Sequence, residues 1–273
     1  MPASYHFKWS FPRLAYLCCP MAQYSHDKIV PFKDSELGKK QQIAAMFDRI
    51  AFRYDFLNRF LSGGIDIYWR RKAIRKLMDL HPRQVLDVAT GTADMAIMMT
   101  RHLSPEKVTG IDISKGMLDI GRQKIARHRL EDHIVLQEGD SENLHFPDNS
   151  FSAITVAFGV RNFENLEKGL KEMLRVLTPG GRLVILEFSQ PRIIGVRQLY
   201  NFYCRRIAPR VGRAVSHSGE AYQYLNDSIR AFPEGKDLVR ILDKCGYVNT
   251  RLKRLSLGIC SIYTGEKAPL TGS

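Results

Sequence analysis

Asp87-Val-Ala-Thr-Gly-Thr-Ala-Asp94 is the stretch that decides the fold of this chain. It follows a short apolar run, Val85-Leu86, and leads into a helix-like stretch. The next apolar run, Val108-Thr-Gly-Ile-Asp112, ends in an acid. A strand, a glycine turn, a helix and an acid that closes the next strand together form a nucleotide-binding βαβ unit, because glycine lets the backbone approach a ligand closely. We therefore predict a nucleotide site at this turn, although an ordinary strand-to-helix turn shares the pattern.

The residues of the turn favour one kind of nucleotide ligand. A dinucleotide fingerprint has three glycines, so that a pyrophosphate can sit on the helix N-terminus, whereas this turn has Gly91 alone. Asp87 and Asp94, at the two ends of the turn, would repel a pyrophosphate. A ligand with an ammonium, a sulfonium and a ribose suits them better, and Asp112 suits the ribose hydroxyls. The pattern thus favours S-adenosylmethionine.

Length and composition are those of one globular domain with additions, since the chain has 273 residues, 44% of them hydrophobic and 25% charged. No apolar run approaches the roughly 20 residues that span a bilayer. The five cysteines are odd in number and show no C-x-x-C spacing, which favours a reducing cytosol and no metal site.

The net charge of +13 is unevenly distributed, because no acid occurs between Glu187 and Glu220. Arginines alternate there with apolar and aromatic residues. This pattern is typical of a packed helix with a solvated basic face, of a segment that binds an anionic membrane surface, or of a segment that binds nucleic acid. Residues 1–26 contain no acid either. We expect Met21 to be the true start, with the first twenty residues an upstream extension; N-terminal sequencing of the native protein tests this.

Alternating strand and helix patterns predict a mostly parallel sheet wound on both faces, with a terminal hairpin that makes one edge antiparallel. Two helices precede the alternation, and Ser114 is expected to cap a later one. The predicted strands are 85–89, 108–112, 134–137, 153–158, 182–188, 247–255 and 258–264; the predicted helices are 39–60, 66–80, 94–102, 114–128, 165–177, 219–231 and 234–245; Thr178-Pro-Gly-Gly181 is a predicted turn.

Four landmarks resemble the class I S-adenosylmethionine-dependent methyltransferases: the first turn, Gly110-Ile-Asp-Ile-Ser114, Phe146-Pro-Asp-Asn-Ser-Phe151 and Leu177-Thr-Pro-Gly-Gly-Arg-Leu183. More narrowly, Phe158-Gly-Val-Arg-Asn-Phe163 and Ser228-Ile-Arg-Ala-Phe-Pro233 look like the quinone C-methyltransferases of menaquinone and ubiquinone biosynthesis. So do Phe47-Asp-Arg-Ile-Ala-Phe-Arg-Tyr-Asp-Phe-Leu-Asn58 and Glu187-Phe-Ser189, and the likeness runs from about Lys39 to Thr264. One departure is Ala93, where the family usually has glycine.

The resemblance implies a Rossmann-like, doubly wound α/β fold with a mostly parallel seven-stranded sheet, an antiparallel edge hairpin and an N-terminal helical lid. We expect 1–38 to be a poorly ordered extension and 39–267 a single methyltransferase domain. Within that domain, the expected parts are N-terminal helices (39–80), a cofactor-binding core (83–190), a basic helical insertion that faces substrate and membrane (191–245) and the terminal hairpin (246–265).

The resemblance also assigns roles to residues at the carboxyl ends of the strands, where open α/β sheets bind ligands. Thr92 would lie beside the cofactor and Asp112 would hold its ribose. Asp140 and Ser141 would lie near the adenine, and position 157 is small, Ala157. Together with Asp87 and Gly91, these are the expected cofactor-binding residues. Turns and caps offer plainer roles for Thr92, Asp140 and Ser141.

Catalysis is expected to need positioning and stabilisation of a phenolate rather than a metal. Arg161 is the first candidate for holding the phenolate, and Asn162 for donating to the same oxygen; a salt bridge to Glu164 and a helix cap are their plainer roles. Weaker candidates are His217, Tyr222 and Tyr224 for substrate contacts, and Tyr54, Asp55 and Asn58 for a lid.

These features predict methyl transfer from S-adenosylmethionine to a ring carbon of demethylmenaquinol. His26-Asp-Lys-Ile-Val-Pro-Phe-Lys33 resembles the corresponding segment of menaquinone-making bacterial relatives, and this resemblance favours the naphthoquinol. The alternatives are C-methylation of the polyprenyl-benzoquinol of ubiquinone biosynthesis, an RNA-binding protein or RNA methyltransferase, and a scaffold without activity. We expect a polyprenyl quinol and an anionic membrane surface as partners, no nucleic acid, and a cytoplasmic protein peripheral to the inner face of the membrane. A homo-oligomer is left open.

Overall fold

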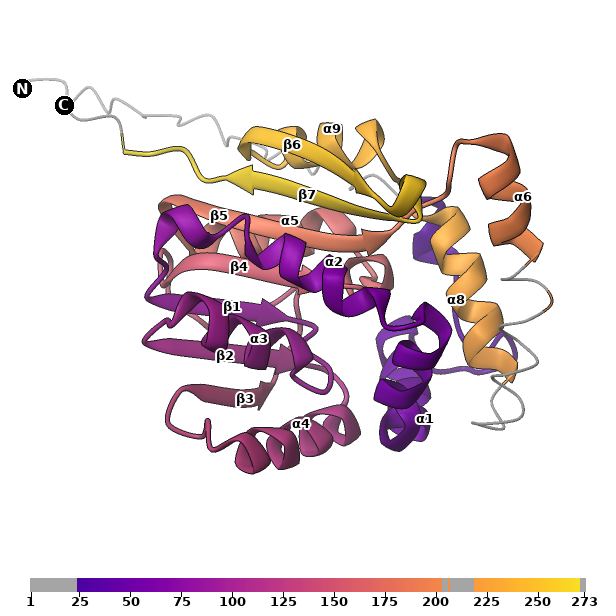
Figure 1. The fold of residues 1–273 in the computed structure, drawn as a ribbon, viewed down its shortest axis with the longest axis horizontal. Helices are drawn as coiled ribbons and strands as arrows, with labels where there is room; N and C mark the ends of the chain where they lie inside the picture. The colour runs from indigo at the N-terminus through magenta and orange to yellow at the C-terminus, as the bar shows by residue number, and fades with distance from the viewer. Residues whose placement is uncertain (1–23, 203–205, 207–218, 271–273) are drawn as a thin grey trace, which may run out of the picture.

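A seven-stranded sheet organises the protein in the computed structural model, which describes residues 24–202, 206 and 219–270 (Figure 1). The strand order is β3-β2-β1-β4-β5-β7-β6. The first five strands are parallel, and β7 is antiparallel to both of its neighbours, β5 and β6. The strands are β1 (Gln84–Val88), β2 (Lys107–Asp112), β3 (Ile134–Glu138), β4 (Phe151–Ala157), β5 (Leu177–Phe188), β6 (Val248–Leu255) and β7 (Cys260–Glu266). The predicted mostly parallel sheet with an antiparallel edge hairpin is confirmed.

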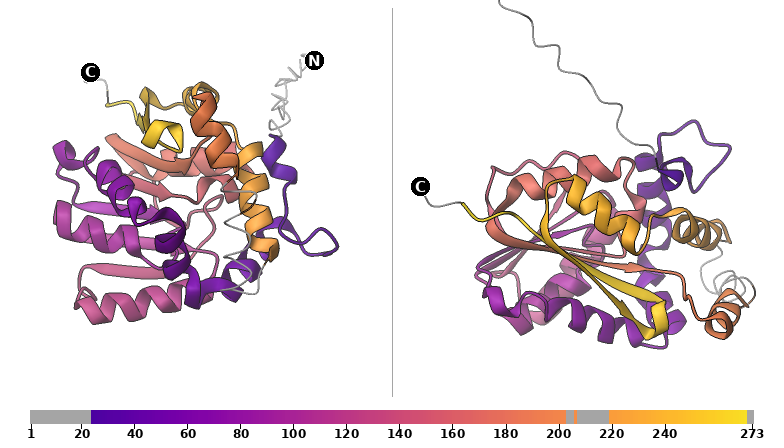
Figure 2. Two further views of the ribbon diagram at one scale, coloured as in Figure 1. Left: turned by 45° about the vertical axis from the view of Figure 1, so that its right-hand side comes forward. Right: turned by 90° about the horizontal axis from the view of Figure 1, so that it is seen from above.

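Helices cover both faces of the sheet (Figure 2). One apolar core lies under α2 (Ile65–Ile74), α3 (Asp94–Leu103) and α4 (Lys115–His128), and includes Trp69 and Leu118. The other lies under α5 (Leu166–Val176) and α9 (Lys236–Lys244), and includes Leu170 and Leu242. The strand residues alternate between the two cores, as the period of two in a strand requires.

The predicted helix start at Ser114 is confirmed, because its side chain accepts a hydrogen bond from the Met117 amide. Two boundaries differ from the sequence prediction by more than two residues. The second helix ends at Ile74 rather than continuing to Leu80, and a short 3-10 helix (Met78–Leu80) follows. The predicted turn at 178–181 lies inside β5, where the pairing with β4 shifts register and Gly180 takes a φ of 76°. Positive φ is the conformation that glycine adopts without strain.

The segment before the first long helix is tied to the domain more closely than a poorly ordered extension would be. Its 3-10 helix η1 (Ser25–Lys28) buries His26 completely, and Tyr24 donates to Glu167 of α5 at 2.6 Å. Lys39 then anchors the start of α1 (Lys39–Ser62) by donating to the carbonyl oxygens of His26 and Phe163. Residues 1–23, and with them the question of Met21, lie outside the described part of the chain.

Three helices lie beyond the carboxyl ends of the parallel strands: α1, α6 (Ile194–Phe202) and α8 (Gly219–Ala231) (Figures 1 and 2). They form the end of the molecule that faces the predicted cofactor site. In the parts of the chain that the structure describes, no helix is both long and apolar enough to cross a membrane.

Candidate functional site

A cleft opens at the carboxyl ends of β1, β2 and β4, between the sheet and α1, and encloses about 670 Å³, part of which is open solvent. Six of the nine residues singled out by sequence as cofactor-binding or catalytic line it: Gly91, Asp112, Asp140, Ser141, Ala157 and Asn162. Asp87, Thr92 and Arg161 are buried beside the cleft and do not line it. The predicted residues therefore come together from five separate stretches of sequence.

Asp112 lies at the end of β2 and faces the cleft. One carboxylate oxygen accepts from the amide of Gly91 at 2.8 Å, and the other accepts from the amide of Ser114 at 2.9 Å. Burial raises the pKa of Asp112 to about 6, although these amide donors act against the rise. A carboxylate oxygen has two lone pairs, so each still has one to offer a ligand hydroxyl.

Asp87 lies beneath the turn, at the end of β1. Its two carboxylate oxygens accept from the hydroxyls of Thr155 at 2.5 Å and Thr90 at 2.7 Å, and only 1% of the residue is exposed. Burial raises the pKa of Asp87 to about 6. In this arrangement its carboxylate holds the turn to β4 and is shielded from the cleft.

The turn itself has an unusual backbone. Gly91 has a φ of 56°, and a Cβ at this position would meet nothing within 4 Å, so the glycine serves conformation and leaves the cleft open above it. Ala89 and Ala93 also have positive φ, at 53° and 65°. Left-handed backbone costs a non-glycine residue about 1–2 kcal/mol. Two strained residues therefore flank Gly91 in this turn, and the glycine expected at position 93 would have removed part of the strain.

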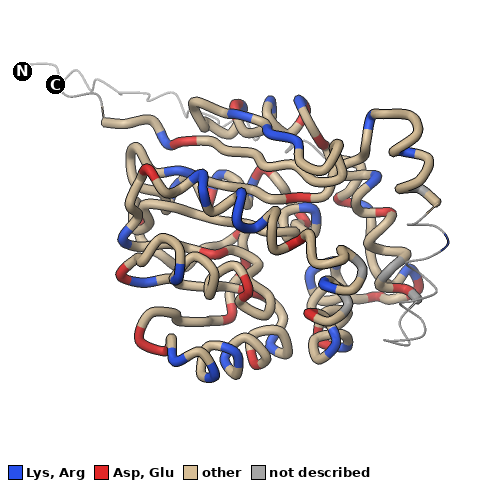
Figure 3. The backbone as a smooth tube through the Cα atoms, viewed as in Figure 1, with Lys and Arg blue, Asp and Glu red and all other residues tan. Residues whose placement is uncertain are grey.

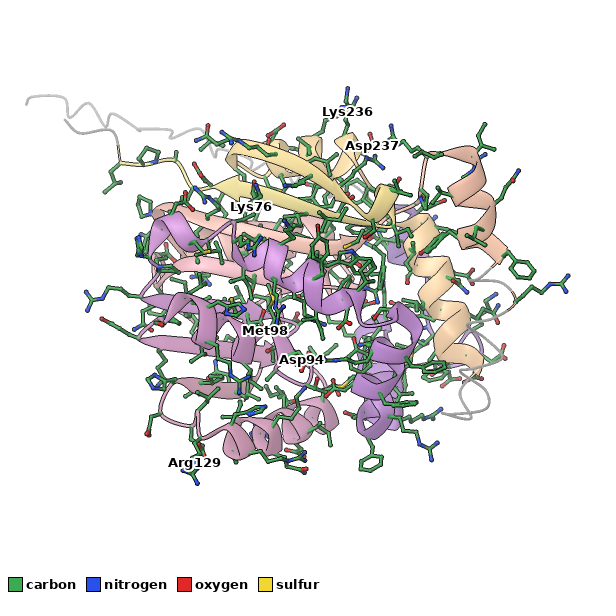
Figure 4. The ribbon with its side chains drawn as sticks, viewed as in Figure 1. Lys76, Asp94, Met98, Arg129, Lys236 and Asp237 are labelled. Atoms are coloured by element: carbon green, nitrogen blue, oxygen red, sulfur yellow. The ribbon has the colours of Figure 1, made fainter. Side chains whose placement is uncertain are left out.

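Polar contacts fasten α1 over this turn. Asp55 accepts from Thr92 at 2.5 Å and pairs with Lys124 of α4 at 2.7 Å. Lys124 also pairs with Asp94, which is labelled at the start of α3 in Figure 4. Asp48 of α1 accepts from the Ser114 hydroxyl and the Gly116 amide at the start of α4. The predicted lid residue Asp55 and the predicted cofactor residue Thr92 thus belong to one contact that closes α1 onto the turn.

The mouth of the cleft carries a second cluster of charges. Lys40 of α1 pairs with Asp140 at 2.7 Å and with Glu142 at 2.9 Å. Glu142 also accepts from the amides of Glu164 and Asn165, which fixes the loop that follows β4. Sequence analysis singled out neither Lys40 nor Glu142; the position of Glu142 two residues after Asp140 at a strand end was the available signal.

Arg161 pairs with a different acid from the one that the sequence suggested. Its guanidinium lies 2.8 Å from Glu187, at the end of β5, and also donates to the carbonyl of Phe158, while its Nε is buried without a partner among the described residues. Glu187 is 1% exposed, and burial raises its pKa while the charge of Arg161 counteracts the rise. The sequence singled out Glu187 only as part of the Glu187-Phe-Ser189 family resemblance. No spacing pattern links it to Arg161, which lies 26 residues earlier in the chain.

Asn162 faces the cleft, and its side-chain oxygen accepts from the hydroxyl of Tyr224 on α8 at 3.0 Å. Tyr54 of α1 lines the cleft too, and burial raises its pKa. Tyr54 and Tyr224 thus approach Asn162 and Arg161 from two of the helices that cover the site. His217 and the side chain of Tyr222 lie outside the described part of the chain.

A metal-binding cluster is absent from the described residues, in the sense that no three or more His, Cys, Asp or Glu side chains gather with ligand geometry. The polar groups that line the cleft are amides, hydroxyls and carboxylates with protein partners. What they can hold is a polar, hydroxyl-bearing organic ligand beside an apolar wall that includes Ile111, Ile113 and Phe158.

Comparison with known proteins adds to this geometry. A model of the ubiE/COQ5 methyltransferase family matches residues 35–267. A demethylmenaquinone methyltransferase of Bacteroides fragilis is 45% identical over 245 residues, which cover 89% of this chain and 99% of the relative. A ubiquinone/menaquinone biosynthesis C-methyltransferase of Geotalea daltonii is 46% identical over 237 residues, covering 86% of this chain and 100% of the relative.

Solved structures share the fold at low identity. A SAM-dependent methyltransferase from Thermotoga maritima superimposes with a TM-score of 0.58 at 17% identity, covering 82% of this chain and 99% of that one. The [4+2]-cyclase SpnF superimposes with a TM-score of 0.56, also at 17% identity, covering 84% of this chain and 96% of that one. One fold therefore serves two different reactions, and the site residues must distinguish them.

Proposed function

Because this chain belongs to the ubiE/COQ5 methyltransferase family, we propose that it transfers a methyl group from S-adenosylmethionine to a ring carbon of demethylmenaquinol, giving menaquinol. The observation that carries the proposal is the 45% identity to demethylmenaquinone methyltransferases from both Bacteroides fragilis and Porphyromonas gingivalis, over 99% of each. The family model covers the whole of the sheet, so the cleft lies within the matched part.

The residues that line the cleft fit the cofactor. Asp112 has acceptor capacity left for two ribose hydroxyls, and Gly91 leaves open space above the turn. Asp140 and Ser141 follow β3 and suit the adenine end of the cofactor. The small side chain of Ala157, at the end of β4, leaves room for the cofactor in the cleft. When bound, S-adenosylmethionine supplies an electrophilic methyl group. Thr92 and Asp87 then act indirectly, by fixing the turn from behind.

Activation of the substrate is the task of the protein side chains. A ring carbon of a quinol becomes nucleophilic as the neighbouring hydroxyl loses its proton, so we expect the reduced ring as substrate. Arg161 stays protonated and therefore serves as a cation rather than a base. Asn162 presents its amide NH2 group to the cleft while its oxygen is held by Tyr224. Both side chains thus supply donors that stabilise a developing phenolate.

The first test is methyl transfer in vitro. Purified protein is incubated with methyl-labelled S-adenosylmethionine and chemically reduced demethylmenaquinol, with a benzoquinol analogue and bulk RNA in parallel. Label on the naphthoquinol supports the proposal, and label on both quinols marks an enzyme of both pathways, as the name of the Geotalea daltonii relative suggests for that protein. Label on RNA alone, or no label despite cofactor binding, contradicts it.

We also propose that the protein works at an anionic membrane surface. Large apolar side chains are exposed on α6 and just before it, namely Ile193, Ile194, Leu199 and Phe202, each more than half exposed. Arg192 and Arg197 accompany them, and neither Asp nor Glu occurs on this segment (Figure 3). Such a basic, apolar surface suits anionic headgroups.

A second exposed apolar stripe supports the same surface. Phe52, Phe56 and Phe60 of α1 recur every fourth residue, so they lie on one side of the helix, and Phe52 is 88% exposed. Both stripes belong to the helices beyond the carboxyl ends of the strands (Figure 1). A substrate with an isoprenoid tail would reach the cleft from the bilayer at this end.

Vesicle sedimentation tests the membrane proposal. The wild-type protein should pellet with anionic vesicles and stay in solution with zwitterionic ones. The double variant L199E/F202E should lose most of the binding, because it places two like charges against the headgroups. A matched change of two residues on the opposite end of the molecule, M78E/V135E, should leave it unchanged. Equal sedimentation of both double variants would exclude α6 as the docking surface.

A further inference from the structure

A second buried arginine, Arg70 of α2, lies beside the cleft with unused hydrogen-bonding capacity. The residue is 7% exposed, and its Nε is buried without a partner. Its nearest acid among the described residues is Asp66, at 3.9 Å, and Asp66 itself accepts from the Ser62 hydroxyl at 2.9 Å. Burying part of a cation without hydrogen-bonding partners destabilises the folded protein. Such a group is expected to gain its partners from a ligand.

The position of Arg70 connects it to the cleft. Its guanidinium carbon lies 5.3 Å from the ring centre of Phe158, and Phe158 lines the cleft. The ring of Phe158 lies 4.5 Å from that of Phe188, and Arg161 lies 5.7 Å from the latter. Two guanidinium groups therefore flank one pair of aromatic rings.

The charges of Arg161 and Arg70 both act on Tyr54. It lines the cleft from α1, and burial raises its pKa while the positive charges of Arg161 and Arg70 oppose the rise. Both charges therefore act on the same wall of the cleft, from two sides of the Phe158–Phe188 pair. An aromatic substrate that carries hydroxyl groups fits such a wall, because its ring can pack on Phe158 while its oxygens face the cations.

The two arginines differ in how far the protein has already neutralised them. Arg161 is 2.8 Å from Glu187 and donates also to a backbone carbonyl, so that pair contributes little net charge. Arg70 donates no hydrogen bond to any described residue, and Asp66 lies at the outer limit of an ion pair. The charge of Arg70 also counteracts the effect of burial on the pKa of Asp87 and of Asp94, but neither carboxylate accepts a hydrogen bond from it. The N–H groups that are free to donate to a ligand oxygen are thus mainly those of Arg70.

We infer that Arg70 is a substrate-binding residue, whose guanidinium holds the deprotonated ring oxygen of a hydroxylated aromatic substrate while the Arg161–Glu187 pair positions the other side of the ring. This inference rests on the proposed function, and it names the group that favours the phenolate. The phenolic proton leaves to solvent through the open cleft. A cation held next to the oxygen stabilises the anionic form and so lowers the pKa of the bound phenol.

A purely structural role for Arg70, as an anchor of α2 on Phe158, predicts a different set of results. The test is therefore a spectroscopic titration of a bound phenol, 1-naphthol, whose phenolate absorbs at longer wavelength than its neutral form. It is carried out with wild type, R70M and R70Q, and with R71M as a matched control, since Arg71 is the exposed neighbour on the same helix. Cofactor binding and thermal unfolding are measured on each variant.

We expect wild type and R71M to lower the pKa of bound 1-naphthol by about one unit or more, and R70M and R70Q to abolish the effect while still binding the cofactor. A charge-assisted hydrogen bond of this kind predicts a loss in kcat/KM for the quinol of about 10- to 100-fold. Identical titrations in wild type and both Arg70 variants, or no lowered pKa in wild type, would overturn the inference. A lowered pKa in wild type without methyl transfer to any quinol would leave the inference standing and refute the proposed function instead.

Discussion

Asp112→Asn should make the empty protein more stable and at the same time weaken its hold on S-adenosylmethionine. The carboxylate is desolvated, which raises its pKa from 3.8 to about 6. One pKa unit corresponds to about 1.4 kcal/mol, so holding the ionised group in the folded protein costs up to about 3 kcal/mol at neutral pH. This figure is a ceiling, because the carboxylate partly faces the cleft. The neutral amide avoids the cost, but its one oxygen can accept from Gly91 or from Ser114 and not from both. The lost hydrogen bond offsets about 0.5–1.5 kcal/mol of the gain, so the net gain is smaller than the ceiling.

The expected loss in affinity comes from weaker hydrogen bonds between residue 112 and the two ribose hydroxyls of the cofactor. A hydrogen bond to a charged acceptor contributes about 1.5–3 kcal/mol and a neutral one about 0.5–1.5, so two such bonds lose roughly 2–3 kcal/mol in the variant. That loss is about 30- to 150-fold in affinity. The pH dependence follows from the same carboxylate. Because its folded pKa lies above the unfolded value, its stabilising contribution is complete below about pH 4 and is lost as pH rises through 6.

Calorimetric titration and thermal unfolding from pH 4.5 to 8 measure both effects. In wild type, cofactor affinity should rise as pH increases through about 6, when Asp112 ionises, and in Asp112→Asn it should be low and flat. The empty variant should unfold a few degrees higher than wild type at pH 8, with the difference vanishing near pH 4.5. Affinity equal to that of wild type would refute the ribose assignment, and a lower unfolding temperature would refute the desolvation argument.

Three further outcomes follow from the buried charges. Arg161→Met should bind cofactor but lose most turnover, and it should lose about 3–5 kcal/mol of stability because Glu187 is left unpaired. Adding Glu187→Gln should restore stability and not activity. Restored turnover in the double variant would remove Arg161 from the mechanism. Lys124→Met should loosen α1 and speed its proteolysis, because Lys124 pairs with Asp55 of α1. Lys115→Met should not, because Lys115 and its partner Glu138 are 75% and 57% exposed. Equal cleavage rates in the two variants would contradict the role of Lys124 in holding α1. Burial lowers the pKa of His26 from 6.5 to about 3, so its contribution to stability is complete above pH 6.5 and is lost as pH falls towards 3; His26→Phe should recover about 2 kcal/mol at pH 5 in denaturant titrations, and an unchanged acid limb would contradict it.

The sheet was predictable because its signal is local. Each strand carries its own apolar run, and the acids and glycines that follow the runs mark the carboxyl edge where the cleft lies. Gly91, Asp112 and Asp140 could therefore be assigned to the cleft from sequence, and the structure places them there. Ser114 was predictable as a cap for the same reason, since the cap and the helix are adjacent.

The partners of the buried charges were not predictable, because they depend on packing between distant elements. Arg161 pairs with Glu187 of β5 rather than with the nearby Glu164, since the end of the neighbouring strand is closer in space than the next residues along the chain. Asp87 was assigned to the ligand for its charge, but the hydroxyls of Thr90 and Thr155 occupy both of its oxygens. Arg70 belongs to no recognised motif, and the burial of its Nε without a partner is a property of the folded structure that the sequence does not reveal.

The order of the strands also bears on how the protein is made. The last strand, β7, lies between β5 and β6, and its residues Cys260–Glu266 pair with both neighbours. A ribosome delivers these residues after both β5 and β6, so the nascent chain keeps one long edge of β5 unpaired until Cys260–Glu266 have been made. A chain that stops before Cys260 would keep the turn with Gly91, yet it would leave β6 without a partner strand and β5 paired on one edge only, exposed to aggregation and to degradation. The solubility of the newly made chain is thus decided at β7, far along the chain from the turn that carries Gly91.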